Sequence, residues 1–461
     1  MFCDPCADRI KLLFDLRFYY KEWFLMTENR KCLIILTGSF PYADGEPYLE
    51  CEISKHVENF EKIIILAQET DADAPQTREV PENIDFYNTA KRSKIAGRAS
   101  DLVRGIVHMP FGAARKFDGA ELSGSPVKSL FAEYFVQRGA RQYRECMEIL
   151  KEYDLSRFDE VVLYSYNFFG LAYAGALIKN DLVSRGIKTL LFSRAHGYDV
   201  YDYTNALNYL PLRRFLLGAV DELFVCSGFG CKYIAGKYPE FSGKISVSYL
   251  GSGDFGPGSR DGVFRVVSCS RVVEEKKLHR IVDALELTKY YDSIPPISWT
   301  HIGSGKDYKK IKAYSAERLG FMEVNFTGGL RNSQVYEYYR NNPCSLFMNT
   351  SLSEGLPVSI MEAASFGIPV LATNAGGTGE IVIDGITGKL VDKNISAEAL
   401  AEEIVRFARM SEAEYSALRA STRKYWEEHF NADTNYKEFS RHIANTDKLV
   451  TEKESQYAAY Q

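Results

Sequence analysis

Short runs of apolar, largely β-branched residues recur along the chain and alternate with longer segments of helical periodicity. In the first half they are CLIILT (32–37), KIIILA (62–67), EVVLYS (160–165), KTLLFS (188–193) and ELFVCS (222–227). Continuous apolar strands separated by helices are typical of parallel sheets that are buried on both faces. The pattern therefore predicts a doubly wound α/β fold.

This pattern stops at GSGDFGPGSRDG (251–262), where five glycines and one proline in twelve positions argue against a regular element. It then restarts with FRVVSCS (264–270), ISWTHIG (297–303), EVNFTG (323–328), CSLFMNT (344–350) and IPVLAT (368–373). A chain of 461 residues is also too long for one compact core. We expect two Rossmann-like domains joined by one hinge, with a cleft between them.

The expected boundaries follow from the same pattern. A first domain would cover 27–252, a hinge linker 253–262 and a second domain 263–424, and a helix over 425–450 would pack back on the first domain. Residues 1–26 would form an N-terminal extension that is helical or disordered. Its aromatic segment IKLLFDLRFYYKEWFLM (10–26) leaves three interpretations open: a helix lying on a membrane surface, a helix packed on its own domain, or a disposable extension before Met26.

Charge and cysteine content exclude some classes of function. A net charge of -5 on this length speaks against a nucleic-acid partner. Nine scattered cysteines indicate reduced thiols, and Cys3 and Cys6, although spaced as CxxC, have no second pair behind them. Because no spanning segment or signal core is evident, we expect a cytoplasmic protein. No DxD-like pair is present where a metal would be needed, so we expect neither a metal nor a bound cofactor.

One basic stretch could nevertheless meet a membrane. Residues 91–118 contain seven Lys or Arg and two Asp, an excess of five positive charges, interleaved with Ile, Leu, Val, Met and Phe. This composition fits a surface for anionic lipid or for a lipid-pyrophosphate acceptor, and it also fits an ordinary solvated helix face. Peripheral contact with the inner face of the cytoplasmic membrane is thus one interpretation.

The most informative local feature is a pair of glutamates, Glu354 and Glu362, in the apolar stretch SEGLPVSIMEAASFGIPV (353–370). CSLFMNT predicts a strand and VSIMEAASFG a helix, so Glu354 falls in the intervening loop and Glu362 on the first turns of the helix. Ligands of open parallel sheets bind beyond the carboxyl ends of the strands. Both carboxylates can therefore face a ligand at one side of the cleft.

The start of this helix suits an anion. The N–H groups of Val358 and Ser359 would point out of the helix end, while Pro357 suits the first turn and donates nothing. Carboxylates repel phosphate, so the glutamates should instead accept hydrogen bonds from hydroxyl groups. A nucleoside-diphosphate sugar supplies both kinds of group.

The motifs around these residues resemble those of the family 4 retaining glycosyltransferases, which have the GT-B fold. E-x7-E is the signature of that family, and EGLPVSIMEAASFGIPVLATNAGGTGEIV (354–382) is similar to its bacterial polysaccharide-synthesis branch. Further similar segments are LTGSFPYADGEPYLECEI (36–53), SRAHGYDVYD (193–202), SRVVEEKK (270–277), HIGSGKD (301–307) and VNFTGGL (324–330). The resemblance spans roughly residues 32–440.

The resemblance implies roles for individual residues. Glu362 would bind the ribose and Glu354 the hydroxyls of the donor sugar, His196 would face that sugar from the first domain, and Gly328 would lie by the nucleobase. Arg271 and Lys276 would hold the diphosphate, with Leu356, Val358 and Ser359 completing the donor site. We therefore expect Glu354, His196, Arg271 and Lys276 to be catalytic and no metal to be needed. Gly376, Gly377 and Glu380 also fit a simple turn and helix cap, so they receive no role.

The expected function is retaining transfer of a hexosyl-type sugar to a saccharide or a lipid-linked saccharide in cell-surface polysaccharide synthesis. Two alternatives stay open: a sugar-nucleotide epimerase or hydrolase of the same fold, and a non-catalytic subunit that only binds the sugar nucleotide. A nicotinamide-dependent oxidoreductase would need GxGxxG after the first strand, where the chain has TGSFPYADG (37–45). The sequence does not identify the nucleobase, the sugar, the acceptor, the linkage or the oligomeric state.

Overall fold

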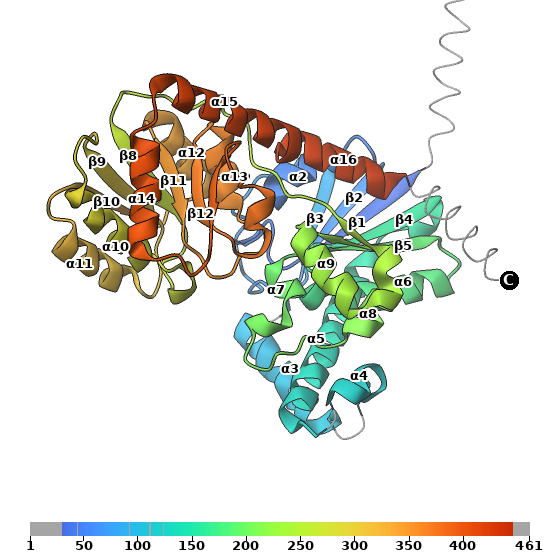
Figure 1. Ribbon diagram of the computed structural model, residues 1–461. Coiled ribbons are helices and arrows are strands. Elements are labelled where there is room, and N and C mark those ends of the chain that lie inside the picture. Colours follow the sequence, from blue (N-terminus) through green and yellow to red (C-terminus); the bar gives the residue numbers. More distant parts are fainter. Residues whose placement is uncertain (1–29, 44, 92, 110–111, 123, 446–461) are drawn as a thin grey trace, which may run out of the picture.

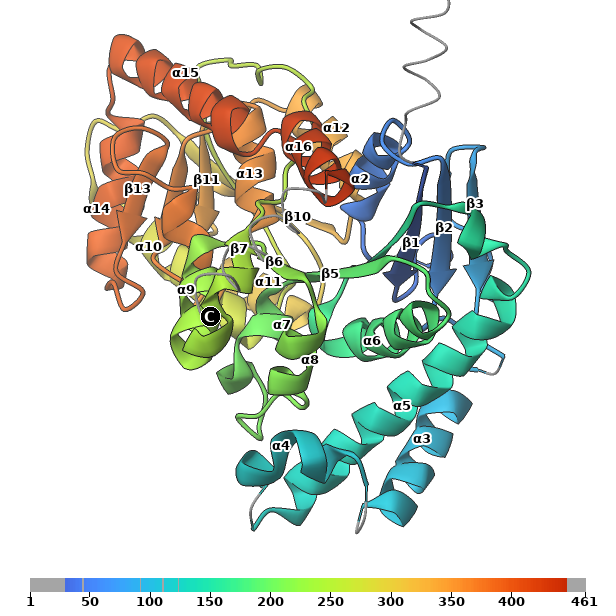
Figure 2. The same ribbon diagram turned by 90° about the vertical axis from the view of Figure 1, so that its right-hand side faces the viewer.

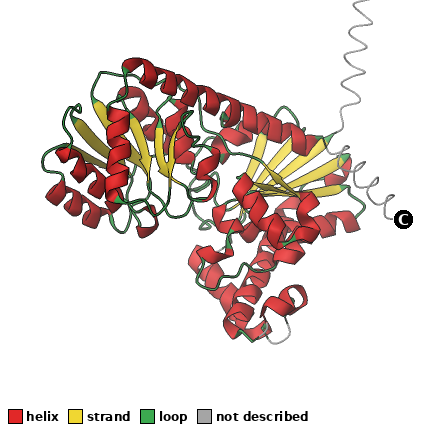
Figure 3. Ribbon diagram, viewed as in Figure 1, coloured by secondary structure: helices red, strands yellow, loops and turns green. Residues whose placement is uncertain are grey.

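The computed structural model describes residues 30–445 except for 44, 92, 110–111 and 123. Two parallel sheets, each with helices on both faces, lie side by side in this part of the chain (Figures 1 and 3). The expected two-domain α/β architecture is therefore present. The segment Ile10–Met26 and the pair Cys3 and Cys6 lie outside the described residues.

The first sheet and its helices form what we call the N-terminal domain. Its strands run in the order β3-β2-β1-β4-β5-β6-β7, with every pairing parallel. They are β1 (Lys31–Thr37), β2 (Lys62–Ala67), β3 (Ile84–Asn88), β4 (Glu160–Ser165), β5 (Thr189–Ala195), β6 (Glu222–Val225) and β7 (Ile245–Val247). The helices are α2 (Leu49–His56), α3 (Lys94–His108), α4 (Ala114–Leu122), α5 (Pro126–Leu150), α6 (Phe168–Ser184), α7 (Gly197–Val200), α8 (Arg213–Ala219) and α9 (Gly228–Lys237), with short turns η1 (Leu155–Arg157), η2 (Asp202–Thr204) and η3 (Pro239–Lys244).

The second sheet and its helices form the C-terminal domain. Its strands run in the order β10-β9-β8-β11-β12-β13, again in parallel. They are β8 (Phe264–Cys269), β9 (Ile297–Ile302), β10 (Glu323–Gly328), β11 (Leu346–Asn349), β12 (Val370–Thr373) and β13 (Gly388–Val391). The helices are α10 (His279–Leu287), α11 (Tyr308–Arg318), α12 (Asn332–Asn341), α13 (Val358–Ser365), α14 (Ala397–Ala408), α15 (Glu412–His429) and α16 (Ala432–Ala444), with turns η4 (Glu274–Lys276), η5 (Thr288–Tyr290) and η6 (Gly376–Glu380).

All ten apolar runs noted in the sequence form strands, whereas β3, β7 and β13 were not predicted. Each of these three strands lies at an edge of its sheet. Edge strands are less buried than central ones, so β3 (IDFYN) has no continuous apolar run, and β7 has only three residues.

Each sheet is covered on both faces by apolar side chains. Alternate residues of β1 point to opposite faces: Cys32, Ile34 and Leu36 pack with α5 and α6, while Leu33 and Ile35 pack with α2 and α16. Helix α16 thus completes the core of the N-terminal domain. Among the described residues, no helix has both the length and the apolar character needed to cross a membrane.

The expected single helix over 425–450 is wrong in its bounds. α15 ends at His429, and α16 begins at Ala432 after a short break, while residues 446–450 lie outside the described part. α15 runs along the C-terminal domain, and α16 lies against α2 of the other domain (Figures 1 and 2). Tyr436 packs in the core of one domain, and Phe439 and Ile443 in the core of the other.

The chain therefore passes between the domains twice, once through the linker after Leu250 and once at the break between α15 and α16. The two crossing segments touch: Ser252 pairs with Asn431, and Trp426 Nε1 donates to Ser252 Oγ at 2.7 Å. The glycine-rich linker is also held by the C-terminal domain, because Gly253 N donates to Tyr336 Oη and Gly258 N donates to the carbonyl oxygen of Phe366. A hinge at this place would consist of two adjacent segments of the chain.

Candidate functional site

A cavity of about 1580 Å³ lies between the two domains, at the carboxyl edges of both sheets. In the C-terminal sheet the cavity lies beside β8 and β11. The strand order reverses between these two neighbours, because β9 and β10 follow on one side and β12 and β13 on the other. Loops at such a position diverge and leave a crevice. The cavity is large enough for a ligand of nucleotide-sugar size.

Most of the predicted site residues line this one cavity. They are His196, Arg271, Lys276, Glu354, Leu356, Val358, Ser359 and Glu362. Gly328 is the exception: it has a φ of 77° and its carbonyl oxygen accepts from Gly303 N, while the next residue, Gly329, lines the cavity. The structure thus places Gly329, the neighbour of Gly328, in the cavity lining, and the role of Gly328 beside the nucleobase stays a prediction.

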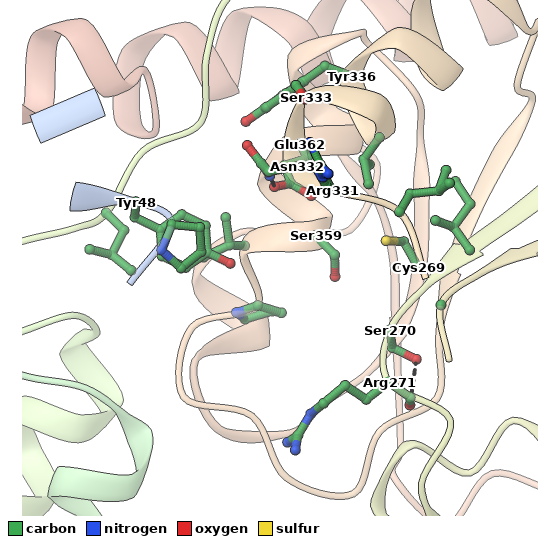
Figure 4. A pocket seen from close by; sticks show the side chains of 18 of the residues that line it. Tyr48, Cys269, Ser270, Arg271, Arg331, Asn332, Ser333, Tyr336, Ser359 and Glu362 are labelled. Atoms are coloured by element: carbon green, nitrogen blue, oxygen red, sulfur yellow. Dashed lines mark hydrogen bonds between the residues drawn. The ribbon is translucent and has the colours of Figure 1, made fainter. Parts of the chain in front are cut away.

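Glu362 is buried on α13, and among the described residues its carboxylate has one hydrogen-bond donor. Asn332 Nδ2, at the start of α12, donates to Glu362 Oε1 at 2.5 Å. Burial raises the pKa of Glu362 from 4.5 to about 7, and the hydrogen bond from Asn332 opposes this shift without cancelling it. Figure 4 shows Glu362 and Asn332 together at one end of the pocket. A carboxylate so poorly solvated is a strong acceptor for a hydroxyl donor.

Glu354 lies in the loop between β11 and α13 and is held by two donors. Lys276 Nζ approaches its Oε1 at 2.6 Å, and Asn349 Nδ2 donates to the same oxygen at 3.1 Å. The turn that carries Lys276 is fixed in place because Thr350 Oγ1 donates to the carbonyl oxygen of Lys276 at 3.1 Å. The other carboxylate oxygen of Glu354 has no hydrogen bond to a described residue, so it is available to a ligand.

One cationic part of the cavity is formed by Arg271 and the start of α13, and Arg78, Lys276 and Arg331 also line the cavity. Arg271 follows β8, and its guanidinium reaches into the pocket at the end opposite to Glu362 (Figure 4). This guanidinium makes no ion pair with any residue in the described ranges. α13 begins at Val358, so the unpaired N–H groups of its first turn add positive potential at the same wall. An anionic group fits between them.

His196 reaches the cavity from the N-terminal domain, at the end of β5. Its Nε2 lies 3.1 Å from the carbonyl oxygen of Tyr166, which can only accept, so Nε2 carries the proton. Burial, and next the positive charge of Arg194, lower the pKa of His196 to about 4. The ring is therefore neutral at physiological pH, with an orientation fixed by the backbone.

Several other side chains of the cavity were missed in the sequence. They include Tyr48 and Arg78 from the N-terminal domain and Ser304, Arg331 and Asn332 from the C-terminal domain. The residues before α12 follow β10 directly, so the rule that ligands lie beyond strand ends could have found Asn332. Tyr48 and Arg78 lie in loops whose course is irregular, and no periodicity marks them.

The domains also touch directly beside the cavity. Gly197 and Gly355 approach so closely that a Cβ added to either would lie 3.0 to 3.1 Å from the Cα of the other. Glu380 of η6 reaches across, and its carboxylate accepts from Gly228 N and Phe229 N at 2.7 and 2.8 Å and from Tyr249 Oη at 2.9 Å. Glu380 thus caps α9 of the opposite domain and helps to hold the cavity closed.

No group of three or more His, Cys, Asp or Glu side chains in the described ranges is arranged to hold a metal ion. The positive potential at the cavity wall comes from cationic side chains and from the N-terminal end of α13.

Residues 254–425 match the family model described as glycosyl transferases group 1. The chain is 28% identical over 242 residues to an uncharacterised glycosyltransferase of Methanocaldococcus jannaschii, covering 50% of this chain and 61% of the relative. It is 26% identical over 210 residues to the amylovoran biosynthesis glycosyltransferase AmsK of Erwinia amylovora, covering 43% of this chain and 50% of AmsK. The matches thus span half to three fifths of the length of these relatives.

Solved structures share the architecture over nearly the whole chain. A sucrose-phosphate synthase from Thermosynechococcus elongatus superposes with a TM-score of 0.62 at 17% identity, covering 93% of this chain and 100% of that one. HepE of Anabaena, solved in complex with UDP, gives a TM-score of 0.58 at 16% identity, covering 90% and 99%. The apo form of the lipopolysaccharide outer core galactosyltransferase WaaB gives 0.58 at 16% identity, covering 91% and 99%. The fold is the two-domain GT-B fold of these proteins.

Proposed function

Residues 254–425 carry a domain of the glycosyl transferases group 1 family, and from this premise we propose that the chain is a retaining hexosyltransferase. It would move the sugar of a nucleoside-diphosphate sugar to a saccharide or a lipid-linked saccharide acceptor in cell-surface polysaccharide synthesis. The amylovoran enzyme among the relatives supports this setting. UDP-sugars are the first donors to test, because HepE was also solved in complex with UDP-glucose.

The observation that carries the proposal is the division of the cavity into an anion-binding wall and a hydroxyl-binding wall. Arg271 and the first turn of α13 suit a diphosphate, while Glu354 and Glu362 each offer a carboxylate oxygen to hydroxyl groups. Lys276 also lines the cavity, and its charge is neutralised by the ion pair with Glu354. A bound diphosphate would also interact with the positive charge of Lys276.

In the proposed reaction the acceptor hydroxyl oxygen forms a bond to the anomeric carbon while the bond from that carbon to the diphosphate oxygen breaks. The electron pair of the broken bond leaves with the diphosphate, and a departing phosphate oxygen takes the acceptor proton. The negative charge that develops on the leaving group is stabilised by Arg271, Lys276 and the N-terminal end of α13. Attack from the face that the diphosphate leaves retains the anomeric configuration.

We assign no metal to this mechanism, because two cationic side chains and a helix end already face the position of the leaving group. We also place the reaction in the cytoplasm. The seven cysteines of the described residues are all free, which suits a reducing compartment.

The test is a thermal-stability screen with UDP-, GDP- and ADP-sugars, followed by a transfer assay with the donor that binds. A ligand at about 100 times its dissociation constant adds roughly 2.7 kcal/mol to the free energy of unfolding. Product analysis then distinguishes transfer from epimerisation or hydrolysis of the donor. A donor that stabilises the protein without turnover, across a panel of saccharide acceptors, would instead favour a non-catalytic binding subunit.

Substitutions at the two glutamates separate binding from turnover. Glu362→Ala should lose most of the donor-induced stabilisation, because the ribose loses its acceptor. Glu354→Ala should keep much of that stabilisation but lose at least about 100-fold in kcat, a value typical of one transition-state contact. Glu337→Ala on α12 outside the cavity lining is the matched control. An unchanged rate in Glu354→Ala would refute the role of this residue.

A further inference from the structure

Helix α3 presents an apolar surface to solvent. Ile95, Val103, Ile106 and Val107 are between 53% and 82% exposed, and Leu102 is 44% exposed. Exposed apolar side chains are ordinary when single, but five of them on a helix of 15 residues form a patch. Ile95, Leu102 and Ile106 recur at spacings of seven and four residues, so they share one face.

The opposite face of α3 is the one that packs on the protein. Its buried residues are Gly97, Asp101 and Gly105, spaced by four. Gly105 lies so close to α5 that an added Cβ would be 3.2 Å from Tyr134 N. Asp101 is fully buried and receives Arg141 Nε and Nη2 at 2.9 Å. Small and polar residues therefore make the internal contact, and the large apolar residues face away from the protein.

The exposed charged side chains of α3 itself are cations, while the carboxylate of the exposed Asp71 accepts from Lys94 N at the start of the helix. Lys94, Arg98 and Arg104 are exposed on α3, and Arg115 and Lys116 are exposed on α4. The acidic residue of α3, Asp101, is buried and paired. An apolar stripe flanked by exposed cations is the arrangement by which a helix lies in the interface of a membrane.

The position of α3 leaves room for such a surface. α3 and α4, with the part of α5 beside them, extend from the N-terminal domain away from both sheets (Figures 1 and 2). A planar partner can meet this end of the molecule without covering the cavity between the domains. The exposed face of α3 is thus accessible to a bilayer.

We propose that the outward face of α3, with the exposed cations of the same helix, is a docking surface for an anionic lipid bilayer. The apolar side chains enter the boundary between headgroups and acyl chains, and the cations pair with acidic headgroups. This inference does not depend on the proposed glycosyl transfer, because vesicle binding is measured without donor or acceptor.

The test is flotation of the full chain with phosphatidylcholine vesicles, with and without phosphatidylglycerol. The protein should float with the anionic vesicles at low salt, and high salt should weaken the binding. Ile106→Ser should lower the partition coefficient about tenfold, because a buried side chain of this size is lost. Arg104→Gln should lower it about fivefold, the equivalent of one basic residue at an anionic surface.

Matched controls keep the outcome interpretable. Val183→Ser changes a side chain of nearly the same exposed fraction, 52% against 53% for Ile106, on α6. Lys424→Gln removes an exposed cation of α15. Both should bind vesicles as the unmodified chain does, and none of the four substitutions should change the melting temperature greatly.

Three results would overturn the proposal. They are equal flotation with neutral vesicles, unchanged flotation of Ile106→Ser, and a concentration-dependent dimer that Ile106→Ser dissociates in analytical ultracentrifugation. The last result would assign the face to a second copy of the chain. Loss of vesicle binding with transfer activity intact on a soluble acceptor would separate this surface from the catalytic site.

Discussion

At the scale of single residues, burial gives Glu362 a chemistry that its exposed counterparts lack. Its pKa of about 7 lies above the ordinary 4.5, so the folded chain holds this proton more tightly than the unfolded chain. The contribution to stability is complete below about pH 4.5 and is lost as the pH rises through about 7, because the ionised form is poorly solvated. A ligand that donates hydrogen bonds to the carboxylate would relieve this penalty.

We therefore expect the affinity for the donor to depend on pH. Between about pH 8 and about pH 6 the Kd of an intact nucleotide sugar should rise by up to about tenfold, because protonation of Glu362 removes a hydrogen-bond acceptor. Isothermal titration calorimetry across this range measures the effect. His196, with a pKa of about 4, does not titrate there.

Glu362→Gln is the control for this prediction, since the amide does not titrate. The variant should bind more weakly than the unmodified chain at about pH 8 and show a flat profile. A slope of the same size in the variant would assign the pH dependence to another group.

At the scale of elements, the loop between β11 and α13 takes its shape from contacts with η6. Gly376 has a φ of 55°, and an added Cβ would lie 1.8 Å from the carbonyl oxygen of Glu354. Gly377 N donates to the carbonyl oxygen of Gly355 at 3.0 Å. The turn of small residues thus supports the loop that carries Glu354 and leads into the start of α13.

Gly376→Ala should consequently displace Glu354 and lower kcat by about tenfold or more, because small misplacements at a reacting centre have large effects. Gly385→Ala is the matched control: Gly385 has a φ of 73° but no atom within 4 Å of an added Cβ. Both variants share a backbone strain of about 1 kcal/mol. Equal kinetics in the two variants would contradict the role of the η6 contact, and circular dichroism would show whether both fold.

At the scale of the whole molecule, the position of one domain relative to the other determines whether the cavity is complete. His196 comes from one domain and Glu354 and Arg271 from the other, so the site exists only when the domains are close. Two crossing segments and α16 connect them, and Glu380 supplies three further hydrogen bonds across the contact, one of them from Tyr249 close to the first crossing segment. The connections favour rotation about a double hinge, limited by Glu380.

Glu380→Ala should shift the equilibrium toward an open arrangement. We expect kcat/KM for the donor to fall by about tenfold and the radius of gyration from small-angle X-ray scattering to increase. Asp384→Ala is the control, because the carboxylate of Asp384 accepts from Leu390 N within one domain. A radius of gyration that stays unchanged, together with unchanged kinetics, would show that Glu380 does not limit opening.

Local sequence was sufficient to predict the central strands, the two α/β halves and the positions of Glu354 and Glu362 at a strand end. These features depend on apolar runs, glycine content and helix signals within a few residues, which act wherever the chain lies. The same rules did not identify Gly329 in the cavity lining, nor the edge strands β3, β7 and β13, although they did identify the edge strand β10.

Tertiary structure alone decided which distant residues meet. Asn332 and Glu362, which form a hydrogen bond, are 30 positions apart. Glu380 caps α9 through residues 151 and 152 positions away. The contacts of α16 with the N-terminal domain join residues several hundred positions apart. No local pattern encodes such pairings, because they depend on how the two sheets are placed. The outward direction of the apolar face of α3 was likewise decided by packing, since composition alone does not show which side of this helix meets the protein.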